Sequence, residues 1–225
     1  MSFPEYEIFP DGQAVAASAC ERILAAAKTA IADHGAFKIV MAGGTTPEAC
    51  YRALAESDSD WSNWHVYIGD ERCLPVDNAE RNSVMAARSL TVHVPIPSEQ
   101  VYAIPAEQGA ESAAQAYTDI VATALPFDMV LLGMGEDGHT ASLFPGHVHN
   151  ESESVHAVHD APKPPPDRVS LSAASLSNTT ELLMLITGAG KQEALTRWRS
   201  GENLPIATIN AENTLVMMDE AAWPE

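Results

Sequence analysis

The segment "GMGEDGHTAS", from Gly133 to Ser142, places an acid and a histidine among closely spaced glycines. His139 lies shortly after Asp137, and a histidine beside a carboxylate is a typical general base, because the carboxylate fixes the imidazole tautomer and stabilises the imidazolium. The apolar run "FDMVLL" precedes the segment. The glycines are therefore expected to turn the chain at the end of a buried strand and to hold Asp137 and His139 at the mouth of a sheet. The alternative is a solvated loop histidine without a catalytic role.

The same glycines match the dinucleotide-binding pattern G-x-G-x-x-G, which predicts a different ligand. Glu136 and Asp137 would face a pyrophosphate with like charge, and Pro145 arrives too soon for the long helix that the pattern requires. The segment also lies deep in the chain rather than in a first strand–helix–strand unit. A loop that carries catalytic groups is therefore favoured over one that binds a nucleotide.

A second glycine segment, "GGTTP", has features typical of a phosphate site. Gly43 and Gly44 offer backbone N–H groups that no side chain obstructs. Thr45 and Thr46 add hydroxyls at the expected start of a helix, where partial positive charge and unpaired donors attract anions. Thr46 is expected to cap that helix, with Pro47 at its first helical position. The alternative is a tight turn between a strand and a helix.

Few basic residues are available to bind an anion, since the chain has only 12 lysines and arginines. Arg168 opens an expected strand after a proline run, and Lys191 opens an expected helix after "TGAG". We expect both to flank strands of one sheet and to clamp a phosphate together with "GGTTP". Asp70 and Arg72, in "GDERCLP", follow another expected strand. The alternative for all four is an ordinary surface charge or ion pair.

Hydrophobic periodicity and turn residues predict an α/β chain in which strands and helices alternate. Helices are expected at 13–34, 46–56, 107–125 and 191–201, and strands at 37–44, 127–135 and 181–189. A strand with its following loop is expected at 64–72, a last strand and tail at 213–223, and an irregular stretch at 147–167. Such alternation is typical of a mostly parallel sheet with helices on both faces. Ligands of these sheets bind beyond the carboxyl ends of the strands, which is where the four polar loops are expected.

The composition indicates which ligands this protein is not expected to bind and which cellular compartment suits it. The net charge of −19 makes nucleic acid and anionic membranes unlikely ligands. Three cysteines without a C-x-x-C pair are typical of a reducing cytoplasm, and no apolar run is long enough to span a membrane. The histidines at positions 147, 149, 156 and 159 match no metal-binding spacing.

Five stretches, taken in order, resemble the 6-phosphogluconolactonase family over residues 37–200. They are "AGGTTP", "GDERCLPVDNAERNS", "LLGMGEDGHTASLFPG", "RVSLS" and "ITGAGKQEAL". The resemblance implies a Rossmann-like fold and one sugar-phosphate-binding domain over 1–225, as a monomer or small homo-oligomer. It also implies hydrolysis of 6-phosphogluconolactone to 6-phosphogluconate without a metal or organic cofactor.

The resemblance also implies a role for each candidate residue. His139 would activate water with Asp137 beside it, and Asp70 and Arg72 would line the sugar end. The phosphate would be held by Gly43, Gly44, Thr45, Thr46, Arg168 and Lys191.

Related deaminases of the same group carry a glutamate five places after the histidine, where this chain has Phe144. Deaminases also read Asp-Glu-Tyr where this chain has "DER", so both positions favour the lactonase. The lactonases usually have serine at the position of Thr45, which keeps the hydroxyl. An isomerase or deaminase of the same fold and a non-catalytic sugar-phosphate sensor remain the alternatives.

Overall fold

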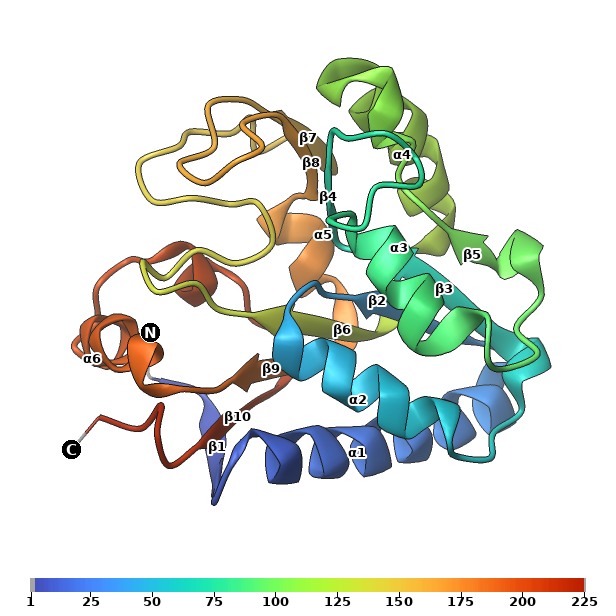
Figure 1. Ribbon diagram of the computed structural model, residues 1–225, viewed down its shortest axis with the longest axis horizontal. Helices are drawn as coiled ribbons and strands as arrows, with labels where there is room; N and C mark the ends of the chain where they lie inside the picture. The colour runs from blue at the N-terminus through green and yellow to red at the C-terminus, as the bar shows by residue number, and fades with distance from the viewer. Residues whose placement is uncertain (1–2, 225) are drawn as a thin grey trace.

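Seven strands form the main sheet in the order β1-β10-β9-β6-β2-β3-β5, and every neighbouring pair is parallel (Figure 1). The computed structural model describes residues 3–224, so the ends of the expected domain 1–225 lie outside the described residues. The strands are β1 (Glu5–Phe9), β2 (Phe37–Met41), β3 (Trp64–Ile68), β5 (Val101–Tyr102), β6 (Phe127–Gly133), β9 (Thr179–Ile186) and β10 (Asn213–Asp219).

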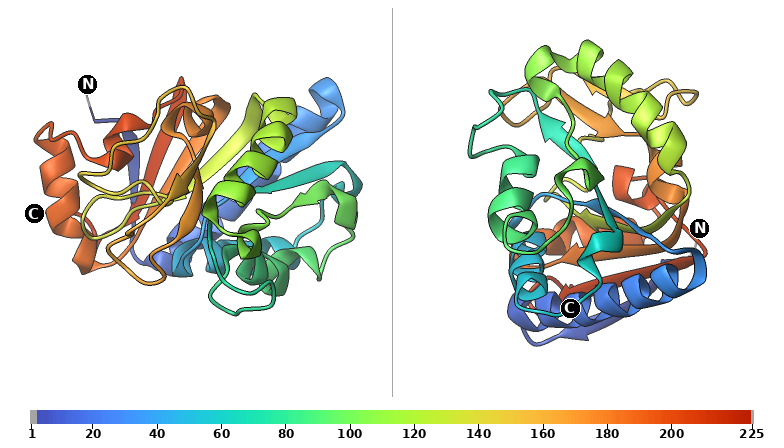
Figure 2. Two further views of the ribbon diagram at one scale, coloured as in Figure 1. Left: turned by 90° about the horizontal axis from the view of Figure 1, so that it is seen from above. Right: turned by 90° about the vertical axis from the view of Figure 1, so that its right-hand side faces the viewer.

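Helices cover both faces of this sheet, as Figures 1 and 2 show. On one face lie α1 (Gly12–His34) and α2 (Thr45–Ala55), and on the other lie α4 (Ala110–Ala124) and the short α5 (Ala173–Ser177). The expected α/β architecture, with a mostly parallel sheet between helices, is therefore confirmed. Within residues 3–224, no helix has both the length and the apolar character needed to cross a membrane.

Local sequence signals explain where the longest helix begins and ends. The Asp11 carboxylate accepts hydrogen bonds from the backbone N–H groups of Gln13 and Ala14, both at 2.9 Å, and so caps α1. Gly35 ends the helix, and its N–H group donates to the Ile31 carbonyl. The buried face of α1, with Val15, Ala19, Ile23 and Ala27, packs on the sheet as the helical periodicity predicts.

A second sheet of three antiparallel strands corrects three of the expectations. It contains β4 (Asp70–Arg72), β8 (Arg168–Leu171) and β7 (Val155–Val158). The stretch 147–167 is therefore not wholly irregular, and the loop expected after β3 contains a strand of its own, β4, in the second sheet. Arg168 does not flank a strand of the main sheet, so that prediction was wrong. These strands have three or four residues each, which is too short for alternation to identify them.

The sequence also gave no signal for β1, which lies at the edge of the main sheet beside β10. Four of its five residues are exposed, and Glu5 and Glu7 flank Tyr6. An exposed edge strand needs neither an apolar run nor a buried face, so its pairing is not visible in the sequence.

The chain reverses direction across the sheet between β2 and β6, which are neighbours. From β2 it proceeds to β3 and β5 on one side, and from β6 to β9 and β10 on the other. Loops that leave the two strands at such a point diverge and open a crevice at the carboxyl edge. The segments after Met41 and Gly133 are the loops that form this crevice.

The central strands should dominate stability because they are buried on both faces. Val130 in β6 is fully buried, whereas Val148 is 94% exposed. We expect Val130→Ala to lower the free energy of unfolding by about 1.5–3 kcal/mol, the range for burying a valine side chain. Val148→Ala should change it by less than about 0.5 kcal/mol. Urea unfolding of both variants makes the test, and equal losses would contradict the burial of β6.

Candidate active site

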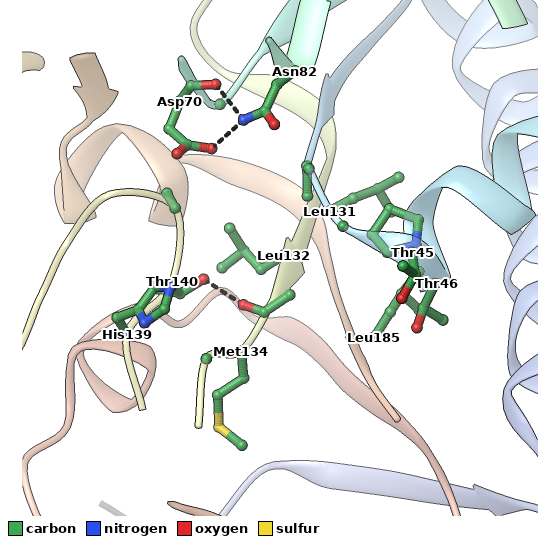
Figure 3. Close-up of a pocket in the computed structure, with 18 of the residues that line it drawn as sticks. Thr45, Thr46, Asp70, Asn82, Leu131, Leu132, Met134, His139, Thr140 and Leu185 are labelled. Carbon is green, nitrogen blue, oxygen red and sulfur yellow. Dashed lines mark hydrogen bonds between the residues drawn. The ribbon is translucent and has the colours of Figure 1, made fainter. Parts of the chain in front are cut away.

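A cavity of about 420 Å³ opens at the carboxyl edge of the main sheet (Figure 3). All four loops that the sequence identified contribute to its wall, at 42–47, 69–72, 133–141 and 185–191. Figure 3 shows His139, Asp70 and Thr45 on three different sides of this pocket, with Leu131 and Leu132 of β6 between them. The structure thus brings together residues as far apart in the sequence as Ala42 and Lys191.

His139 and Asp137 form a close hydrogen-bonded pair. The distance between His139 Nδ1 and Asp137 Oδ1 is 2.5 Å, and the backbone N–H of His139 donates to the same oxygen at 3.1 Å. Burial alone would raise the pKa of Asp137, but these two hydrogen bonds outweigh it and lower that pKa below its ordinary value. With Nδ1 directed at the carboxylate, the imidazole carries its proton there and presents a basic Nε2.

Gly135 makes this arrangement sterically possible. A Cβ atom at position 135 would lie 2.1 Å from His139 Nδ1 and 2.8 Å from Asp137 Oδ1. Any side chain would therefore displace the imidazole from its carboxylate partner. The absence of a side chain at position 135 lets the His139 ring lie against the backbone there.

The glycine pattern in this loop is not followed by the helix that a dinucleotide site needs. After β6 the chain forms turns and an isolated bridge between Thr140 and Leu143, and the next strand is β7. No long helix begins there to bind a pyrophosphate at its N-terminus. The interpretation as a catalytic loop therefore fits the structure better than the nucleotide interpretation.

The "GGTTP" loop starts α2, but Thr46 does not cap it as expected. The helix begins at Thr45, so Gly44 occupies the capping position and no side chain caps the helix. The Thr46 hydroxyl instead lies 2.5 Å from the Thr187 hydroxyl in the loop after β9. The first N–H groups of α2, at Thr45 and Thr46, consequently remain available to a ligand. Gly43 and Gly44 line the pocket beside them.

Strand β4 forms the wall opposite this loop. Asp70 and Arg72 line the pocket, while Glu71 is directed the other way because successive side chains of a strand alternate. Asp70 accepts hydrogen bonds from Ser142 Oγ at 2.6 Å and from Asn82 Nδ2 at 2.9 Å. Burial raises the pKa of Asp70, whereas the Ser142 hydrogen bond and the nearby arginines act in the opposite sense.

Arg168 and Lys191 both line the pocket, but they reach it from different sheets. In the antiparallel register, Arg168 of β8 is the cross-strand partner of Arg72. The Arg168 guanidinium lies 5.6 Å from the ring centre of Phe144 and donates to the carbonyl oxygens of Lys163, Pro164 and Pro165. Lys191 follows β9, and burial lowers its pKa although the charge of Glu136 opposes that effect.

Three residues of the pocket region were not assigned a function from the sequence: Asn82, Ser142 and Lys163. Asn82 and Ser142 hold the Asp70 carboxylate, and Lys163 lines the pocket from the proline-rich segment before β8. Lys163 is one of only four lysines in the chain. That scarcity was the one sequence signal that could have drawn attention to it.

The histidines at 147, 149, 156 and 159 are not arranged as a metal site. The rings of His149 and His156 stack with centres 4.5 Å apart, and His159 instead pairs with Glu111 and Asp167. Within the described part of the chain, no group of three histidine, cysteine or acidic side chains could hold a metal ion.

Comparison with known proteins identifies the family. The model of the family described as "Glucosamine-6-phosphate isomerases/6-phosphogluconolactonase" matches residues 10–218. The chain belongs to this family. The 6-phosphogluconolactonase of Mycobacterium tuberculosis is 38% identical over 236 residues, which cover 96% of each chain. A chloroplastic 6-phosphogluconolactonase of Arabidopsis thaliana is 38% identical over 206 residues, covering 82% of this chain and 63% of the plant protein.

Solved structures of the family share the fold. The 6-phosphogluconolactonase of Thermotoga maritima superposes with a TM-score of 0.89 at 28% identity, over 96% of this chain and 98% of the other. A monomeric glucosamine-6-phosphate deaminase superposes almost as well, with a TM-score of 0.86 at 18% identity, over 97% and 98% of the two chains. The fold therefore does not separate the family's activities, and side chains in the pocket must do so.

The lowered pKa of Asp137 predicts a pH-dependent contribution to stability. A carboxylate with a depressed pKa in the folded state stabilises the protein above its unfolded pKa, and this stabilisation is lost as the pH falls through the folded pKa. We expect Asp137→Asn to be less stable than wild type at pH 7, and the difference to shrink as the pH falls from about 4 through the lower folded pKa of Asp137. It should stay below about 1 kcal/mol, because the Asp137 side chain is 38% exposed.

Urea unfolding at a series of pH values makes this measurement. Asp58→Asn, at an exposed aspartate, is the matched control. An equal pH dependence of stability in both variants would contradict the role assigned to the Asp137–His139 hydrogen bond.

Proposed function

We propose that this protein hydrolyses 6-phosphoglucono-1,5-lactone to 6-phosphogluconate, the activity that its relatives' names state. The observation that carries the proposal is the grouping of positive charge around a histidine–carboxylate pair. Four of the chain's 12 lysines and arginines line one pocket, although the net charge is −19. Arg72 and Arg168 are direct cross-strand partners, and the one Asp70 carboxylate near both offsets only part of their like charge.

His139 is the proposed general base. Its Nε2 takes a proton from water, and the water oxygen forms a bond to the lactone carbonyl carbon. The tetrahedral intermediate then breaks the bond between that carbon and the ring oxygen, and the imidazolium returns its proton to that oxygen. A positioned base of this kind accelerates a reaction by roughly 10²–10⁴-fold.

Asp137 is the proposed partner that orients the base. The 2.5 Å contact with Nδ1 holds the tautomer whose Nε2 is basic. The carboxylate also stabilises the imidazolium that forms when Nε2 is protonated, as in other histidine–carboxylate pairs. Because the lowered pKa keeps Asp137 ionised at neutral pH, this stabilisation is present whenever the substrate reacts.

The phosphate is proposed to bind between α2 and the basic side chains of the pocket. The uncapped N–H groups at Thr45 and Thr46 supply neutral donors, with Gly43 and Gly44 beside them. Lys191 and Arg168 supply charge, and Asp70 and Arg72 are proposed to line the sugar end. No step of this scheme needs a metal or organic cofactor.

The choice between lactonase and deaminase rests on Phe144. The deaminases carry a glutamate at this position, whereas here a buried phenyl ring packs on His139, with ring centres 4.8 Å apart. An apolar ring cannot exchange protons with a sugar, so the pocket lacks the additional acid that a deaminase uses. With Phe144 beside it, His139 has no second acid as a partner at this position, which supports a role in activating water. A sensor without turnover would gain nothing from the paired His139.

His139→Ala tests the mechanism. We expect kcat to fall by at least about 10²-fold, because the general base is lost, while KM changes little. Lactone hydrolysis is followed by proton release, corrected for the spontaneous reaction. His93→Ala is the control, since His93 is exposed and hydrogen-bonds only the backbone of its own turn among described residues. Wild-type turnover in His139→Ala would remove this residue from the mechanism.

Lys191→Ala tests the phosphate site. A charge-assisted hydrogen bond contributes about 1.5–3 kcal/mol, so its loss should raise KM for the phosphorylated lactone by roughly 10- to 100-fold. Unphosphorylated glucono-1,5-lactone lacks the phosphate, and its hydrolysis should change little. Equal losses on the two lactones would show that Lys191 does not bind the phosphate.

A further inference from the structure

The proline-rich segment before β8 forms part of the pocket wall, at the upper left of Figure 1. Lys163 and Pro164 line the cavity. The loop is closed by a hydrogen bond from the Ala161 N–H to the Pro166 carbonyl at 3.0 Å. Three consecutive prolines follow Lys163 and restrict the backbone dihedral φ of the loop. Lys163 is therefore presented to the pocket from a stiff backbone.

The Arg168 side chain holds the same loop by hydrogen bonds to its backbone carbonyl oxygens. Its Nη2 donates to the carbonyls of Lys163 at 2.9 Å and Pro164 at 3.2 Å, and its Nε donates to Pro165 at 3.2 Å. The arginine is 5% exposed, and its guanidinium lies over Phe144. Its Nε and Nη2 groups thus donate to the backbone of the loop that carries Lys163. These are the hydrogen bonds by which Arg168 holds that loop.

The Lys163 ammonium group, by contrast, has only a weak partner. Its Nζ lies 4.0 Å from Glu136 Oε2, and the two side chains are 54% and 69% exposed. Glu136 also lies beside the segment that carries Lys191, since a Cβ atom at Gly190 would be 3.3 Å from its Oε1, and its charge acts on Lys191. One exposed carboxylate thus lies near two ammonium groups. A dianionic phosphate matches two ammonium groups better than a single carboxylate does.

We propose that Lys163 is a specificity-determining residue that binds the substrate phosphate together with Lys191, while Arg168 positions Lys163 by holding the loop carbonyls. This inference rests on the proposed function, because it assigns the phosphate of that substrate. Glu136 is the internal counter-ion that the phosphate displaces. Removal of Lys163 should weaken binding of the phosphorylated substrate, and removal of the Glu136 charge should strengthen it.

The first experiment compares Lys163→Ala with wild type on 6-phosphoglucono-1,5-lactone and on unphosphorylated glucono-1,5-lactone. KM for the phosphorylated lactone should rise about tenfold, the low end for a charge-assisted hydrogen bond, with kcat unchanged. Hydrolysis of the unphosphorylated lactone should not change. Lys28→Ala is the matched control, because it removes the same charge from an exposed position on α1. Calorimetric titration with 6-phosphogluconate should show the same loss of affinity without turnover.

Two further variants test the parts played by Glu136 and Arg168. Glu136→Gln should lower KM by up to about fivefold, the scale of an exposed ion pair. Arg168→Lys keeps the charge but loses the loop contacts, so it should raise KM as Lys163→Ala does. The double variant should have the KM of the single variant with the larger effect, because Arg168→Lys keeps the charge of the arginine and both changes remove the same contact of Lys163.

The outcomes separate the inference from the function on which it rests. If wild-type protein does not hydrolyse the phosphorylated lactone, the proposed function fails and this inference fails with it. If wild-type protein is active but Lys163→Ala has the KM of Lys28→Ala, only the inference is overturned. Additive effects of Arg168→Lys and Lys163→Ala would overturn the positioning role of Arg168.

Discussion

The parallel pairing of β2 with β6 is the constraint on which the pocket depends. Because all seven strands of the main sheet are parallel, their carboxyl ends share one edge. The loops after β2, β3, β6 and β9 must therefore converge there, whatever residues they contain. Their polar side chains would be costly inside a two-sided sheet, but at its edge they meet each other, water or a ligand. The His139–Asp137 pair and the "GGTTP" loop are thus neighbours because of the strand order.

The small antiparallel sheet turns this open edge into a walled pocket. Glu71, on the side of β4 away from the cavity, accepts hydrogen bonds from the backbone N–H groups of Arg72, Asn82 and Ser83 at 2.7–2.9 Å. Arg81 Nε lies 3.4 Å from the same carboxylate. A fully buried carboxylate is tolerated only when it is paired and hydrogen-bonded in this way. It ties β4 to the start of α3 (Asn82–Ala86) and thereby fixes the wall that carries Asp70 and Arg72.

Basic side chains are concentrated in the pocket although the whole chain is acidic. Charges farther away than about 8 Å are largely screened at physiological salt, so the net charge of −19 matters less than the local basic groups. Those groups repel one another, and nearby carboxylates offset the repulsion. Asp70 faces the two arginines, and Glu136 lies near the two lysines. A bound phosphate would replace Glu136 as the negative charge beside the two lysines. The affinity for the phosphate would then depend on the position of the Glu136 side chain.

The sequence alone determined the features that depend on neighbouring residues. The helix ends at Asp11 and Gly35, the buried strands, and the His139–Asp137 pair all follow from residues a few positions apart. Only the tertiary structure decided which distant residues meet. Asp70 binds Ser142, 72 positions away, Thr46 turns to Thr187 instead of capping α2, and Arg168 lies in a second sheet with its donors engaged by the loop of Lys163. Periodicity reports which face of an element is buried, but not which element packs against it or where a polar side chain finds its partner. These contacts depend on how the two sheets pack, and the short strands of the second sheet show no periodicity from which they could be predicted.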